Sequence, residues 1–171
     1  MLEGNGFLSR QALIGYGAAG AIVVLDQWTK HLASLELSYR VPVELTSWFD
    51  LTLAHNTGAA FSFLAGAGGW QRWFFTAVAA AVRVVLIVWL SRLPRHRVPL
   101  AVALGLVLGG GLGNLYDRVA LGYVVDFISI HYHQWYWPAF NIADSAITVG
   151  ASVLVLDSFR STEPSRPQAG D

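Results

Sequence analysis

Two aspartates, Asp126 and Asp144, lie at the edges of apolar segments in a chain that carries few other charges. A carboxylate close to hydrocarbon is costly, so an ionisable residue kept there is by default a candidate functional group. Two carboxylates within hydrogen-bond reach do not both ionise easily, and they share one proton. The ionised member can activate water while the protonated member polarises a carbonyl. The pair therefore indicates hydrolysis of a peptide without a covalent intermediate.

Asp144 follows Asn141 by three residues, at the predicted start of a helix. Because the first turn of a helix favours negative charge, we take Asp144 as the hypothetical carrier of the charge. The same spacing also fits a capping box in which Asn141 is the cap. Asp126 could likewise end a surface loop. The spacing alone favours neither the catalytic interpretation nor the structural one.

Other polar residues form helical pairs. Asp26 and Lys30 are four residues apart on one helical face and are predicted to form an ion pair. Lys30 is the only lysine, and no serine stands out as its partner, so a structural pair is favoured over a Ser–Lys hydrolase. Arg118 lies one turn from Asn114 and could pair with Asp117 or bind a phosphate or carbonyl of a lipid-linked substrate.

The sequence contains little that could hold a metal. His131 and His133 form an isolated His-x-His with no evident third ligand, which is too little to indicate zinc. The chain has no cysteine, so it has no disulfide, thiol nucleophile or cysteine metal site. We expect neither a metal nor an organic cofactor.

The composition is that of an integral membrane protein. Hydrophobic residues make up 54% of the 171 residues, charged residues 13%, and the mean hydropathy is +0.48. A soluble domain usually carries about 25% charged residues. The formal net charge is zero, which gives no indication of nucleic-acid binding. We expect one helical unit over residues 1–162 and a disordered cytoplasmic tail over 163–171.

Four membrane-spanning helices are predicted. Residues 73–90 and 98–115 meet the length and hydropathy expected of a span, whereas 12–29 and 142–159 are weaker because each carries an aspartate. Glycines at 105, 109 and 113 recur every four residues, a spacing that lets helix backbones approach closely.

The charges predict an orientation. The loop 91–97 holds three arginines and a histidine, which makes it cytoplasmic by the positive-inside rule, together with both termini. The connections 30–72 and 116–139, and with them Asp126 and Asp144, then face outward. Aromatic residues gather at the same predicted boundary: Trp70, Trp73, Trp135, Tyr136 and Trp137. Apolar and polar residues alternate over 39–45 and 49–53, and this pattern predicts a small sheet on the membrane surface.

Five strings occur in an order that is recognisable as a set. They are Asp26-Gln27-x-x-Lys30, Asn56-Thr57-Gly58-Ala59-Ala60-Phe61-Ser62, Gly113-Asn114-Leu115-Tyr116-Asp117-Arg118, Val124-Val125-Asp126-Phe127 and Phe140-Asn141-Ile142-Ala143-Asp144-Ser145. The chain closely resembles the lipoprotein signal peptidases, or signal peptidase II, over roughly residues 20 to 160. Any one of these strings alone would be weak evidence, but together they are highly specific.

The resemblance implies an aspartyl peptidase of the bacterial inner membrane, with Asp126 and Asp144 as the catalytic pair. Its substrates would be prolipoproteins whose lipobox cysteine carries diacylglycerol, cut just before that cysteine. It implies substrate-binding roles for Asn56, Asn114, Arg118 and Asn141, and a structural role for Asp26 with Lys30. The implied fold has four transmembrane helices, a small extracytoplasmic sheet and an outer lid, with the outer β/lid region at about 31–70. We expect a monomer in contact with membrane lipids.

Two other classes of function remain open. A small transporter could use Asp126 and Asp144 as proton or cation sites at a broken helix, and would need a water path through the whole bilayer. A scaffold could bind lipoproteins without cutting them, and would keep binding after Asp→Asn changes. A peptidase instead predicts an outer-leaflet pocket closed from the cytoplasm.

Overall fold

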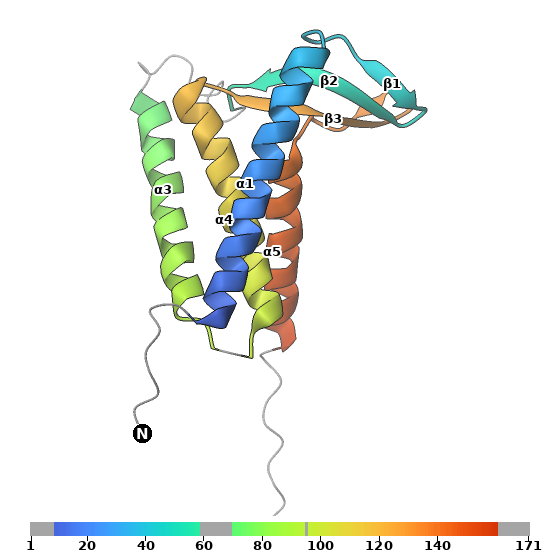
Figure 1. Cartoon of the computed structure of the whole chain (residues 1–171). Coiled ribbons are helices and arrows are strands. Elements are labelled where there is room, and N and C mark those ends of the chain that lie inside the picture. Colours follow the sequence, from blue (N-terminus) through green and yellow to red (C-terminus); the bar gives the residue numbers. More distant parts are fainter. Residues whose placement is uncertain (1–8, 59–69, 95, 161–171) are drawn as a thin grey trace, which may run out of the picture.

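The computed structural model describes residues 9–58, 70–94 and 96–160. Its helices are α1 (Arg10–Glu36), α3 (Trp70–Ser91), α4 (Val98–Ala120) and α5 (Ile142–Arg160), and its strands are β1 (Val43–Thr46), β2 (Phe49–Asn56), β3 (Val124–Tyr132) and β4 (Trp135–Tyr136). The four helices run side by side, and the sheet stands across one end of the bundle (Figure 1). The expected tail over 163–171 and residues 59–69 of the expected β/lid region lie outside the described residues.

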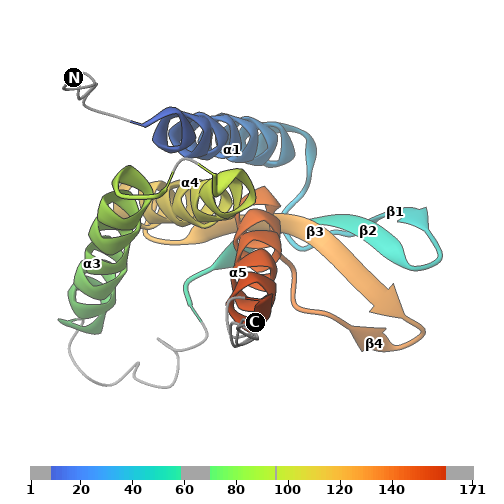
Figure 2. The ribbon, with the colours of Figure 1, turned by 90° about the horizontal axis from the view of Figure 1, so that it is seen from below.

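Helix α4 is the centre of the bundle, with α1, α3 and α5 around it (Figure 2). Its apolar residues Ala101, Leu104 and Leu108 are buried against Ala19 of α1 and Leu90 of α3. The chain leaves α4 directly into β3, and it enters α5 shortly after β4. The end of α4 and the start of α5 are therefore held next to the sheet.

The glycine repeat of α4 is confirmed as a packing face. A Cβ atom at Gly105 would collide with the backbone of Gly15, and one at Gly109 would collide with that of Ala19. Further along, a Cβ atom at Gly113 would collide with the Asp26 carboxylate. Because all three glycines face α1, their spacing brings α1 and α4 together and leaves room for Asp26 between them.

The outward faces of the helices are apolar. Val84 and Val85 of α3 and Val149 and Val155 of α5 are each more than half exposed. In the part of the chain that the structure describes, two segments are long and apolar enough to cross a membrane, Val98–Ala120 and Ile142–Phe159. The second was expected to be weaker than 73–90. Its two acidic residues lie near its ends, however, and leave an unbroken apolar middle.

The sheet has four antiparallel strands in the order β1-β2-β3-β4. The two expected strands are present with shifted bounds, whereas β3 and β4 were not predicted. Asp126 lies in β3 opposite Ala54 of β2 and is only 1% exposed. The interpretation of Asp126 as the end of a surface loop is therefore wrong.

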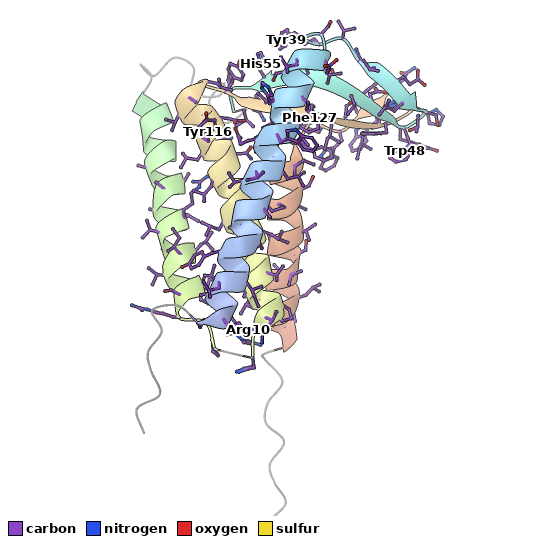
Figure 3. All side chains as sticks on the ribbon, viewed as in Figure 1. Arg10, Tyr39, Trp48, His55, Tyr116 and Phe127 are labelled. Carbon is purple, nitrogen blue, oxygen red and sulfur yellow. The ribbon has the colours of Figure 1, made fainter. Side chains whose placement is uncertain are left out.

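The two ends of the bundle differ in character. Tyr39 and His55 lie with the sheet, whereas Arg10 lies at the opposite end (Figure 3). The beginning of α1, the connection from α3 to α4 and the end of α5 share the Arg10 end (Figure 1). Trp135, Tyr136 and Trp137 are exposed at the sheet end, as expected. The side chains of Trp70 and Trp73 lie outside the described residues.

Candidate active site

The two aspartates singled out in the sequence meet where the sheet joins the bundle. Asp126 is the third residue of β3, and Asp144 lies in the first turn of α5. Asp126 is buried and Asp144 is half-buried. The charge of Asp144 acts on the Asp126 carboxyl, so the two groups are within electrostatic reach.

The Asn141 side chain forms hydrogen bonds with both aspartates. Its Oδ1 accepts a hydrogen bond of 2.9 Å from the backbone N–H of Asp144, which confirms the predicted helix cap. Its Nδ2 donates to Asp126 Oδ1 at 2.7 Å and to the carbonyl of Val125 at 3.2 Å. The capping and catalytic interpretations are thus compatible, because one side chain performs the capping and also orients Asp126.

Asn114 forms the second link between the aspartates. Its Nδ2 donates to Asp144 Oδ1 at 2.7 Å, and its Oδ1 accepts from Asn141 Nδ2 at 3.2 Å. The same Oδ1 accepts from Lys30 Nζ at 2.9 Å. Because an ammonium group only donates, the amide oxygen must face Lys30, and the amide nitrogen is left for Asp144.

A buried ionic cluster lies behind these asparagines. Lys30 Nζ lies 2.8 Å from Asp26 and 2.9 Å from Asp117, and all three side chains are at most 4% exposed. Gln27 donates to Asp117 Oδ1 at 2.9 Å, and Asp26 Oδ1 accepts from the N–H of Ala143 at 2.9 Å. The predicted Asp26–Lys30 pair is confirmed, and the cluster joins α1 and α4 to the start of α5.

Asp117 was missed as a member of this cluster. The sequence left it as a partner for Arg118, yet its carboxylate pairs with Lys30 and accepts from the N–H of Val125 at 3.2 Å. The hydrogen bond to Val125 holds the backbone of the residue immediately before Asp126. Arg118 is half-buried, and its Nη1 donates to the carbonyl of Asn114 at 3.3 Å. The sequence did carry a signal for Asp117, since Asp117 lies within one of the five ordered strings.

Asn56 completes the surroundings of Asp126. It ends β2, pairs with Val124 in the ladder and hydrogen bonds to the Asp126 carboxyl. Its Oδ1 also accepts from the N–H of Gly58 at 2.9 Å, which shapes the turn after the strand. Five of the predicted site residues, Asn56, Asn114, Asp126, Asn141 and Asp144, are therefore in one hydrogen-bonded group, with Arg118 bonded to the backbone of Asn114.

The Asp126 carboxyl lies in an environment that favours its protonated form. The pKa of Asp126 is raised to about 6, chiefly by burial, and the charge of Asp144 contributes in the same direction. The hydrogen bonds from Asn56 and Asn141 oppose that shift. Asp144 lies instead at the N-terminus of α5, where the helix dipole stabilises negative charge. Such a pair can supply an acid and a base to the same bond.

A helical bundle with an apolar exterior, and at one end a carboxyl pair of which one member is buried and the other half-buried, is typical of a hydrolytic membrane enzyme. A family model described as "Signal peptidase (SPase) II" matches residues 18–160, so the chain belongs to the signal peptidase II family. That family is one of proteases.

Relatives of known name also point to the signal peptidase II family. A lipoprotein signal peptidase of Teredinibacter turnerae is 57% identical over 152 residues, which are 89% of this chain and 90% of that protein. One of Acinetobacter baumannii is 53% identical over 159 residues, 93% of this chain and 90% of its own.

Solved structures show the same fold. Two determinations described as a bacterial membrane enzyme solved by the in meso method match with TM-scores of 0.77 and 0.78. Their sequences are 28% and 27% identical to this chain, and the matches cover 86% and 92% of it and 94% of each solved chain. None of the proteins named in these comparisons is described as a transporter.

Proposed function

We propose that this protein is an aspartyl peptidase that removes the signal peptide from prolipoproteins, with Asp126 and Asp144 as its catalytic pair. The observation that carries the proposal is the hydrogen-bonded bridge through Asn114 and Asn141, which links the two carboxyls. Membership of the signal peptidase II family supports the same reaction.

In the proposed reaction, Asp126 begins protonated and Asp144 begins ionised. Asp144 takes a proton from water as the water oxygen attacks the scissile carbonyl carbon, and Asp126 gives its proton to the carbonyl oxygen. The C–N bond of the resulting gem-diol then breaks. The leaving amine takes the proton from Asp144, and Asp126 regains a proton from a hydroxyl. The raised pKa of Asp126 supports its role as the acid.

Asn56, Asn114, Arg118 and Asn141 are proposed to surround the substrate. Asn56 and Arg118 lie at the edge of the hydrogen-bonded group, where an N–H donor can reach a carbonyl of the substrate. Asn114 and Asn141 have much of their hydrogen-bonding capacity committed to the aspartates. We therefore assign them chiefly to orientation of the pair.

The proposal includes a topology. All four helices would cross the bacterial inner membrane, with both termini and the 91–97 loop in the cytoplasm and the sheet outside. The distribution of arginines and the shared end of α1, α5 and the α3–α4 connection support this arrangement (Figure 1). The aspartates would then lie near the outer leaflet.

We propose a substrate whose cysteine carries diacylglycerol. An anchored lipid keeps the scissile bond at the membrane surface, at the depth of the proposed site. Restricting the substrate to two dimensions with a fixed register lowers the entropic part of the barrier. The protein is proposed to act as a monomer, and its own side chains supply the acid and the base.

The proposal is tested with purified protein in detergent and a prolipoprotein peptide prepared with and without the diacylglyceryl group. We expect cleavage immediately before the lipidated cysteine, identified by mass spectrometry, and no cleavage of the unlipidated peptide. An inert protein that instead carries protons or cations across vesicles would contradict the proposal. Binding of the lipidated peptide without cleavage would indicate the scaffold.

A further inference from the structure

A groove runs beneath the β3–β4 hairpin and along the first turns of α5, with a volume of about 720 Å³. Its walls are mostly apolar and include Ile130, Trp135, Trp137, Pro138, Phe140 and Val149. Asp144 also lines the groove, so the apolar space reaches one member of the proposed catalytic pair. The hairpin projects beside α5 away from the bundle (Figure 2).

We propose that this groove binds an acyl chain of the lipid carried by the substrate. The inference rests on the proposed function, because it concerns the substrate of the same site. The lipid of such a substrate is attached to the residue next to the scissile bond. An acyl chain in the groove would therefore start beside Asp144 and would fix the register of the bond to be cut.

The polar groups of the walls favour an acyl chain over a peptide. The hydroxyls of Ser145 and Thr148 already donate to the carbonyls of Asn141 and Asp144, at 3.0 and 2.8 Å. In the hairpin wall, the N–H of Trp137 donates to the carbonyl of Ile130 at 2.9 Å. An extended peptide would leave its own N–H and C=O groups without partners against such walls, which is costly. An acyl chain has no such groups.

The position of the groove suits a chain that extends into the outer leaflet. Trp135 and Trp137 are more than half exposed, and their rings meet edge to face with centroids 5.8 Å apart. Tryptophan is enriched at the membrane–water boundary because its ring is amphipathic. Val149, on the opposite wall, belongs to the apolar exterior of α5. The groove therefore joins the proposed site to the hydrocarbon.

The inference is tested by filling the groove with Val149→Trp. Val155→Trp is the matched control, because Val155 is equally exposed (55% against 54%) and lies further along α5, outside the groove. Both variants, checked for wild-type thermal stability, are assayed on one peptide whose diacylglyceryl group carries either palmitoyl or butyryl chains. We expect Val149→Trp to raise KM for the palmitoyl substrate about tenfold, the factor for roughly two buried methylenes.

In that test kcat should change little, and KM for the butyryl substrate should stay near the wild-type value. Val155→Trp should leave both substrates unaffected. An equal loss on both substrates, or no effect of Val149→Trp, would overturn the inference. If the wild type cuts neither lipopeptide, the proposed function itself fails, and the inference fails with it.

Photo-crosslinking shows whether the acyl chain in the groove belongs to the substrate or to a membrane phospholipid. A diazirine is placed on the acyl chain of the lipopeptide or, separately, on that of phosphatidylcholine in the same micelles. We expect the lipopeptide to label the β3–β4 hairpin and α5 near Val149, and Val149→Trp to abolish that labelling. Labelling of the groove by the phospholipid alone would overturn the assignment of the groove to the substrate.

Discussion

Lys30 lies buried behind Asn114 and donates a hydrogen bond of 2.9 Å to its side-chain oxygen. This contact fixes the orientation of the Asn114 amide, whose nitrogen then donates to Asp144 at 2.7 Å. A cation on α1 thus determines the position of a carboxylate on α5 through a residue of α4. The ionic cluster is therefore part of the scaffold of the site, although it need not touch the substrate.

Loss of the Lys30 ammonium should strongly destabilise the protein. Lys30→Met leaves Asp26 and Asp117 buried without their cation, which typically costs about 3–5 kcal/mol of unfolding free energy. Arg97→Met is the control, because the Arg97–Asp157 pair is partly exposed and such pairs contribute about 1 kcal/mol or less. Thermal unfolding in detergent compares the two variants. Equal shifts in Tm would contradict the structural role given to Lys30.

Substitutions of Asn141 should separate capping from orientation of Asp126. Serine retains an oxygen that can cap α5, so Asn141→Ser should lose less stability than Asn141→Ala, which loses the cap as well as the amide donors. Serine lacks the amide nitrogen that donates to Asp126, so kcat should fall about tenfold or more. Asn141→Ala should lose both stability and activity. Full activity in folded Asn141→Ser would show that the 2.7 Å bond is dispensable.

The activity should depend on the protonation of Asp126. With a pKa raised to about 6 by burial, Asp126 is protonated below that pH and loses its proton above it. Because the proposed acid must carry a proton, kcat/KM should fall about tenfold per pH unit above about 6. In Asn141→Ser the fall should begin at higher pH, since a hydrogen bond that lowers the pKa is gone. A profile that rises through this range would contradict the assignment.

The close approach of α1 and α4 should depend on glycine at position 105. A methyl group there would collide with the backbone of Gly15, so Gly105→Ala should cost about 1–3 kcal/mol by overpacking. Gly17→Ala is the control, because a Cβ atom at Gly17 meets open space. That change should be neutral or stabilising by up to about 1 kcal/mol, the helix preference for alanine. Thermal unfolding of both variants measures the difference, and similar losses would contradict the packing argument.

Local patterns predict the helices of this protein better than its sheet. The apolar runs at 98–115 and 142–159, the glycine repeat and the Asp26–Lys30 spacing each depend on residues close in sequence, and the structure contains all of them. Strand β3 was missed because it is buried along much of its length. Its first four residues are all buried, so the start of the strand lacks the alternation that marks a half-exposed strand.

The catalytic role proposed for Asp126 and Asp144 follows from the chemistry of paired carboxyls, and the resemblance to the family strengthens it. The contacts that orient the pair join residues far apart in the chain, such as Lys30 with Asn114 and Asn141 with Asp126. No local spacing encodes those contacts. They become visible only once α1, α4, β3 and α5 are packed together.

The most direct test of the central claim compares cleavage by Asp126→Asn and Asp144→Asn with that of the wild type on a diacylglyceryl-modified prolipoprotein. Asparagine keeps the oxygens that accept from Asn141 and Asn114, so both variants should fold. Asp157→Asn, far from the pair, is the control. We predict that each variant of the pair loses about 10²–10⁴-fold in kcat while the control stays active. Near-wild-type activity in either folded variant would contradict the assignment of Asp126 and Asp144.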